Sequence, residues 1–251
     1  MIHNESTIIF NNTNSGAFGL FLLEKFEIKS AEFETTDIEI PGRNGSVVIG
    51  KNRYKNISFP MNMYMERLFN SKIERQISLA KEWLGKAKGG YRILENNLYL
   101  DYVFKAKLTS ATFSRESFQR ADCTLSFDLF PFKYLKDTYS KERTLKSGET
   151  FQSKGTQIAY PIITLTGTGN VILTVNGKPF ILKNVTGGVV IDCENQVVTD
   201  LAKKNSQMNK VYSYPFPALK IGSNTISWEN SAFTGTVSYT HLRAHETLSD
   251  L

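Results

Sequence analysis

Apolar and polar side chains alternate along many short segments of this chain. The longest alternating segment covers residues 57–65, and a shorter one covers 37–40. Because successive side chains of a strand point to opposite faces of a sheet, this period of two predicts half-buried strands. Alternation or short apolar runs predict the other strands, at 26–28, 91–95, 98–108, 121–130, 171–175, 180–182, 189–191, 196–198 and 224–228. We therefore expect a mainly β fold.

One helix is predicted among these strands, over about 71–85. Ser71 and Glu74 have the spacing of a capping box, in which the hydroxyl and the carboxylate bind the first free N–H groups of a helix. Gly85 is predicted to end the helix, and Lys86 and Lys88 would favour its carbonyl end. Apolar residues recur at helical spacing within this range and just before it: Phe69, Ile73, Ile77, Ala80 and Leu84, widened by Leu79 and Trp83.

The polar stretch 137–156 lacks a sustained apolar period and predicts a domain boundary. We expect an N-terminal domain over 1–140 and an all-β domain over 141–251. In the second domain, Asn176-Gly177 predicts a hairpin with a type I′ turn, and the short strands have the spacing of a sandwich. The last segment, 239–251, does not follow strand alternation and reads like a read-through or assembly scar, so we expect it not to be native.

Composition excludes several classes of protein. A chain with 41% hydrophobic and 12% aromatic residues can build a core and is not disordered. No run approaches the roughly 18 apolar residues of a membrane span. The net charge of +6 divides equally between 1–140 and 141–251, and such a small excess does not indicate nucleic-acid binding. The basic stretch 51–92 is expected to be a solvated or partner-facing surface. Since no signal peptide is evident, we expect folding in a cytoplasm.

The sequence offers little catalytic chemistry. Only three histidines occur, and His241 and His245 lack both the Glu of a zinc motif and an evident third ligand. Cys123 and Cys193 lie in strand-like runs and are expected to be buried, unpaired thiols. We therefore predict no catalytic residue, no cofactor and no metal, and a protein that is not an enzyme.

Several motifs follow one another in a recognisable order. In the N-terminal part they are 37–46, 57–59, 82–84, 102–107, 123–127 and 131–132, and in the C-terminal part they are 160–163, 167–169, 175–177, 190–192, 216–219 and 221–228. In this order and spacing the chain resembles the distal tail proteins (Dit) of siphophages that infect Gram-positive bacteria, the siphovirus-type tail component family.

The resemblance implies an N-terminal β-sandwich-like domain that carries one α-helix and a protruding hairpin and closes a hexameric ring. It also implies a smaller C-terminal galectin-like β-sandwich. The homo-hexamer would be a structural baseplate hub at the distal tail tip of the virion. It would join the tail tube, built of the major tail protein, to the tail-associated lysin or fibre protein and to receptor-binding proteins. Such a phage or prophage protein is assembled in the host cytoplasm and binds neither a membrane nor nucleic acid beyond the genome that passes its lumen.

The hairpin over 37–50 is the predicted subunit interface. Apolar side chains alternate on both of its arms, and an isolated two-stranded ribbon cannot bury them by itself. Arg43 at the tip should matter less, because an exposed ion pair contributes at most about 1 kcal/mol. The predicted interface consists of Ile38, Ile40, Pro41, Gly42, Arg43, Asn44, Gly45, Val47 and Ile49.

A second interpretation stays open for the C-terminal domain. It could be a glycan-binding module that contacts the host cell wall through Tyr214, Phe216 or Trp228, whose rings could stack on sugars. Such rings more often belong to a core or an interface. Alternation places Ile226 and Trp228 on one face, so we expect the indole in the core and little or no binding of simple sugars.

Overall fold

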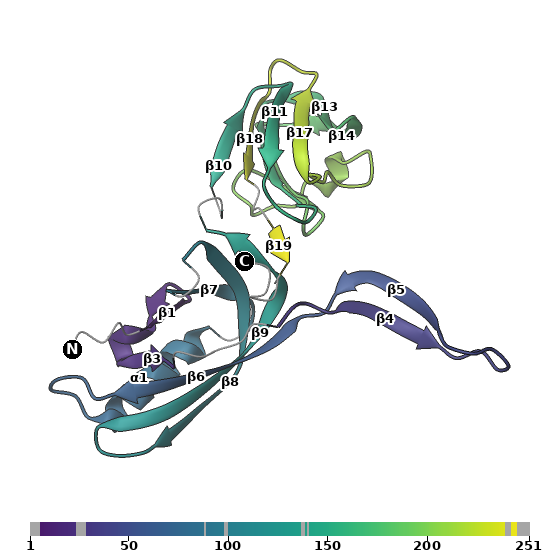
Figure 1. The fold of residues 1–251 in the computed structure, drawn as a ribbon. Coiled ribbons are helices and arrows are strands. Elements are labelled where there is room, and N and C mark those ends of the chain that lie inside the picture. Colours follow the sequence, from purple (N-terminus) through teal and green to yellow (C-terminus); the bar gives the residue numbers. More distant parts are fainter. Residues whose placement is uncertain are drawn as a thin grey trace. The chain divides into compact units, whose positions relative to one another are not determined.

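The computed structural model describes residues 6–23, 29–87, 89–97, 100–136, 139, 141–238 and 242–244. The chain divides into two compact units, one formed by Met1–Lys133 with Ala244–Leu251 and the other by Tyr134–Arg243 (Figure 1). Among the residues described, no helix is long and apolar enough to cross a membrane. Both units are built mainly of antiparallel strands, as the sequence predicted.

The first unit contains one large sheet. Its strands, in spatial order, are β2 (Thr13–Asn14), β1 (Ile8–Phe10), β7 (Arg92–Asn96), β8 (Tyr102–Arg115), β9 (Arg120–Leu135), β6 (Ile57–Glu66) and β3 (Leu20–Leu22), and β19 (Leu242–Ala244) also pairs with β9. The 3-10 helix η1 (Ser15–Phe18) connects β2 with β3.

Strand β6 shows why this sheet forms. Every second residue from Ile57 to Met65 is buried, and the residues between them face outward. The partner strand β9 alternates in register, so that Met61 lies opposite Leu125. These side chains, together with those of β1, β3 and helix α1 (Ile73–Lys86), form one apolar core. Burial of such a face contributes about 25 cal/mol per Å².

Helix α1 forms at the predicted place, but the predicted capping box is wrong. The helix begins at Ile73 with Lys72 as N-cap, and no side chain caps it. Asn70 has a φ of 60° and turns the chain just before the helix, so Ser71 lies outside it. The predicted stop at Gly85 is also wrong, because the helix continues to Lys86.

The apolar stripe of α1 is narrower than predicted. Phe69 is 94% exposed and Leu79 is 43% exposed, so neither belongs to the core. The side chains that the helix buries are Ile73, Gln76, Ala80, Trp83 and Leu84. The Trp83 indole donates a hydrogen bond to the carbonyl of Phe10 and stacks on Phe18, which fixes the helix against β1 and η1.

The second unit contains a five-stranded and a four-stranded antiparallel sheet. The first consists of β10 (Glu142–Leu145), β18 (Thr234–Ser238), β12 (Ile162–Thr166), β15 (Val189–Asp192) and β16 (Val197–Thr199). The second consists of β11 (Glu149–Ser153), β17 (Gly222–Trp228), β13 (Gly169–Val175) and β14 (Lys178–Val185). A short 3-10 helix, η2 (Met208–Lys210), contacts β14 and β16.

Direct contacts join these two sheets. Gly235 of β18 leaves space for the Trp228 indole of β17, because a Cβ at this glycine would lie 2.9 Å from the ring. The predicted type I′ turn is confirmed: Asn176 and Gly177 have φ values of 52° and 80°, and Val175 pairs with Lys178 across the turn.

Other strand predictions are confirmed in part. The sequence missed β1–β3, β10–β12 and β18, and the polar stretch 137–156 contains β10 and β11. The strand predicted at 26–28 lies outside the described residues. So do 239–241 and 245–251 of the segment that we expect not to be native, whereas 242–244 form β19.

Candidate functional site

Two strands of the first unit pair only with each other among the described strands. They are β4 (Phe33–Ile38) and β5 (Val47–Tyr54), which we call the arm (Figure 1). Ile38 lies opposite Val47, and Thr36 lies opposite Ile49. The connecting loop contains Gly42 and Gly45 with φ values of 81° and 80°, a backbone conformation that glycine adopts without strain. The predicted hairpin therefore exists, with its turn at 41–45.

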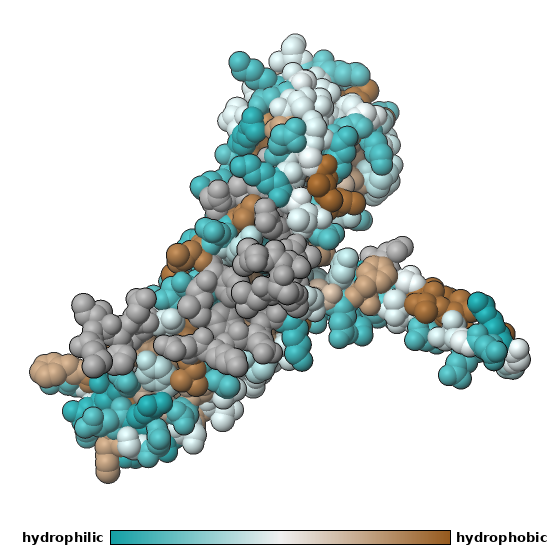
Figure 2. Space-filling view, in the orientation of Figure 1, coloured by the Kyte–Doolittle hydropathy of each residue, from teal (hydrophilic) through white to brown (hydrophobic). Residues whose placement is uncertain are grey.

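The arm exposes apolar side chains on both of its faces. Because cross-strand partners share a face, Ile38 and Ile49 point to one side and Val48 points to the other. The exposed fractions are 43% for Ile38, 50% for Ile49 and 60% for Val48, and Ile40 beyond the strand is 45% exposed. Figure 2 shows hydrophobic side chains gathered on this arm. Val48 was missed from sequence, since it falls between the alternating positions.

A charged cluster lies nearer the base of the arm. The Glu34 carboxylate accepts hydrogen bonds from Lys51 Nζ at 2.7 Å and from Arg53 Nε. The hydrogen bond from Arg53, and then that from Lys51, lowers the pKa of Glu34 to about 2. These ion pairs join β4 to β5 where the register shifts between Phe33 and Thr35.

The Glu34 carboxyl group should therefore titrate near pH 2 in the folded arm. Its pKa is below the ordinary value of 4.5, so its contribution to arm stability is present above pH 4.5 and is lost as the pH falls through about 2. Carbon-13 NMR of the side-chain carboxyl measures this titration. Arg53→Ala should raise the midpoint more than Lys51→Ala does, and an unchanged midpoint in both variants would contradict the assigned cause.

A row of aromatic rings connects the arm to the large sheet. Phe33 and Tyr54 pack edge to face at 5.4 Å, and Tyr54 packs on Phe132 of β9 at the same distance. Phe132 in turn packs on Phe130 at 6.1 Å. Gly50 leaves room for the Phe33 ring, which would have to shift if a Cβ stood 2.9 Å from it. Each such ring pair contributes about 0.5–1.5 kcal/mol beyond its buried area, so the base of the arm is held against β9.

The structure brings two of the three aromatic residues of the glycan prediction together: Tyr214 packs on Phe216 with ring centroids 5.8 Å apart, and Trp228 is not part of this pair. Phe216 is buried against Phe180 at 5.0 Å, whereas Tyr214 is 69% exposed. Both line a cavity of about 660 Å³ beside the loop 213–220. Trp228 does not line that cavity; it is half-buried and its indole N–H donates to the Phe233 carbonyl at 2.9 Å.

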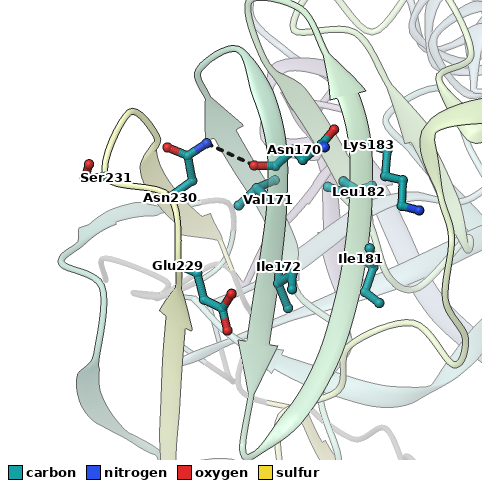
Figure 3. A pocket seen from close by; sticks show the side chains of 9 residues that line it. All are labelled: Asn170, Val171, Ile172, Ile181, Leu182, Lys183, Glu229, Asn230 and Ser231. Carbon is teal, nitrogen blue, oxygen red and sulfur yellow. Dashed lines mark hydrogen bonds between the residues drawn. The ribbon is translucent and has the colours of Figure 1, made fainter.

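An open pocket of about 520 Å³ lies on β13 and β14 beside residues 229–231 (Figure 3). Two of its polar side chains, Asn170 and Asn230, are bound to neighbouring backbone, and Lys183 and Glu229 also line it. Asn230 donates to the Asn170 carbonyl at 2.9 Å, and the Asn170 side chain accepts from the Asn184 amide at 2.9 Å. A sugar site needs polar groups that converge on the ligand, and the two asparagines of this pocket are already engaged with backbone.

The described residues hold no group of three His, Cys, Asp or Glu side chains that could bind a metal ion. All three histidines of the sequence lie outside the described residues. Cys123 and Cys193 are buried free thiols, as predicted. Burial raises the pKa of Cys123 to about 12 and, with the nearby Asp192 carboxylate, also raises that of Cys193. Neither thiol is suited to act as a nucleophile near neutral pH.

No protein-family model and no curated protein sequence matches this chain. Among solved structures, it is similar to the SPP1 Dit (gp 19.1) protein, described as a paradigm of the hub adsorption apparatus in phages that infect Gram-positive bacteria. The TM-score is 0.67 at 13% sequence identity, over 94% of this chain and 98% of that chain. The chain therefore has the mainly β fold of a siphophage distal tail protein, as its motif order predicted.

Proposed function

We propose that this protein is the ring-forming hub of a siphophage tail tip. In this role a homo-hexamer joins the tail tube to the tail-associated lysin or fibre protein and to receptor-binding proteins. The fold similarity supports a structural tail or baseplate role. The main observation in favour of the proposed ring is that the arm exposes the apolar side chains of Ile38, Ile40, Val48 and Ile49.

Exposed apolar side chains on a two-stranded ribbon favour contact with another subunit. Such a ribbon is at best marginally stable alone, and its unpaired edges invite association with another chain. A contact between two different surfaces of identical subunits closes into a ring when its rotation permits. Burial of the arm on the next subunit would thus stabilise both the arm and the ring.

The proposed role is structural and not enzymatic. The two thiols are buried and their pKa values are raised, so they offer no ready nucleophile. The lowered pKa values of Glu34, Glu82, Glu149 and Asp200 come from ion pairs or hydrogen bonds on the protein surface. A general acid near neutral pH would need a raised carboxyl pKa instead.

Glycan binding by the second unit is the alternative function. It rests on Tyr214, whose exposed ring borders the 660 Å³ cavity. Phe216 and Trp228 do not support it, because one is buried and the other donates its N–H to backbone. The hub role accounts for the arm, which a monomeric lectin would not need.

Light scattering on the purified protein separates the two functions. The hub should have a mass near six times 28.4 kDa and show rings in electron micrographs, because a neighbouring subunit is needed to bury the exposed apolar side chains of its arm. A lectin module would have a mass of one or two chains. A monomer at tens of micromolar that binds cell-wall glycans would overturn the hub proposal.

A further inference from the structure

Three residues connect the arm to the large sheet, and we call them the junction. They are Tyr54, which ends β5, and Lys55 and Asn56, which precede β6. The Lys55 amide donates a hydrogen bond to the Glu32 carbonyl at 2.8 Å, and Lys55 Nζ lies 3.5 Å from the Glu32 carboxylate. The chain that leaves the arm is therefore tied to the chain that enters it.

The Asn56 side chain joins the junction to the face of the large sheet opposite the core. Its amide nitrogen donates to Asp128 Oδ2 of β9 at 3.0 Å and to the hydroxyl of Tyr91, directly before β7. The NH₂ group carries two hydrogens, so it can make both bonds at once. Asp128 also lies 3.5 Å from Lys107 Nζ of β8. One side chain of the junction is thus bound to parts of the sheet that are distant in sequence.

The Tyr54 side chain reaches the same place by another route. Its ring packs on Phe132 at 5.4 Å, and Phe132 packs on Phe130 at 6.1 Å. Phe130 in turn packs on Tyr91 at 6.0 Å. Because Tyr91 also accepts the hydrogen bond from Asn56, these five side chains form a closed circuit. A rotation of the arm about the junction would strain both branches of this circuit.

The spacing of the residues explains why both branches meet on one face. Tyr54 and Asn56 are two residues apart, as are Asp128, Phe130 and Phe132 of β9. Side chains two residues apart in an extended chain point to the same side. The alternation of β9 buries the residues between these three in the core, so its outward positions are the ones that face the junction.

We infer that this circuit locks the junction, so that the arm keeps one orientation relative to the large sheet in the free subunit. A freely swinging arm would have to be ordered by each partner that binds it, and that ordering weakens binding. A locked junction removes this cost before any partner arrives. The inference does not depend on the proposed ring, because every contact of the circuit lies within one chain.

Residual dipolar couplings of the backbone amides test the lock. They are measured on the chain that carries Ile38→Asp and Ile40→Asp, in which no neighbouring copy is expected to hold the arm. Couplings from β4 and β5 should fit the same alignment as those from β6 and β9. Tyr54→Ala with Asn56→Leu removes both branches and should reduce the arm couplings to less than half, while the couplings of the sheet persist.

Three further variants keep this test sharp. Asn56→Leu alone removes one branch at an exposed position and should give a smaller loss, which serves if the double variant does not fold. Tyr54→Phe should keep the arm couplings, because the packing ring remains. Phe113→Ala is the matched control: it removes a half-buried ring from β8, where Phe113 contacts Lys81 and lies outside the circuit. It should leave the arm couplings unchanged.

Three results would overturn the lock. The first is an arm whose couplings are already averaged in the starting chain. The second is a set of arm couplings that neither Asn56→Leu nor the double variant changes. The third is loss of the cross-strand contact between Thr36 and Ile49 in the double variant, because the circuit would then stabilise the fold of the arm and not its orientation. A wild-type chain that is itself monomeric can be measured directly, so failure of the ring proposal leaves the test intact.

Discussion

Replacement of Ile38 and Ile40 by aspartate should convert the proposed hexameric ring into folded monomers. Both side chains are more than 40% exposed in the single chain, so the change costs the isolated subunit little. In the ring, each subunit would have to bury two carboxylates without partners, and burial of an unpaired charge costs several kcal/mol. Light scattering should show a mass near 28.4 kDa with an unchanged circular dichroism spectrum.

Arg43→Ala provides the comparison at the tip of the same arm. Its guanidinium can form only an exposed ion pair, so most of the hexamer should persist. Hexamers that survive the double aspartate change would falsify the assignment of the arm as the interface. Loss of the ring on Arg43→Ala alone would instead show that charge, and not apolar burial, dominates the contact.

Gln76→Leu should lower the free energy of unfolding of the first unit by about 3 kcal/mol. The side chain is 2% exposed and makes three hydrogen bonds at 2.9 Å, to Leu68, Glu66 and Phe18. Leucine keeps the volume but leaves three part-buried backbone groups without this partner, and a group left unpaired away from water costs about 1–3 kcal/mol. Urea unfolding followed by Trp83 fluorescence in a Trp228→Phe background measures this unit separately.

Ser71→Ala is the control for that measurement, because sequence reasoning assigned the helix cap to this residue. The Ser71 hydroxyl does not cap α1, so the variant should lose less than about 0.5 kcal/mol. A loss near 1 kcal/mol, typical of a removed N-cap, would restore the capping box. An unchanged stability of Gln76→Leu would show that its hydrogen bonds contribute nothing net.

The long strands of the first unit could be predicted because they cross the core. In β6, and in β9 from Arg120 to Phe132, every second residue is buried, so the period of two is visible in sequence. Strands β1–β3 span only two or three residues each, and β10 and β11 are mostly polar. Their pairing depends on neighbours distant in sequence, which local patterns do not reveal.

The prediction of the candidate site from sequence was incomplete for the same reason. Turn residues and alternation identified the arm. They did not identify Val48, which lies on the other face of the arm from Ile38 and Ile49. Phe69 fits the helical spacing of α1, yet the left-handed Asn70 turns the chain between Phe69 and Ile73. Periodicity depends on the residue types alone and does not reveal this turn, so the exposed Phe69 was assigned to the core.

The two buried thiols have a practical consequence for labelling. With a pKa of about 12, Cys123 holds only about one thiolate in 10⁵ molecules at pH 7, and Cys193 is buried as well. The wild-type chain therefore provides an almost unreactive background for maleimide dyes. A single cysteine introduced in place of Arg43 at the arm tip would accept the label selectively. Fluorescence could then follow the arm from the free subunit to the assembled particle without any native cysteine being removed.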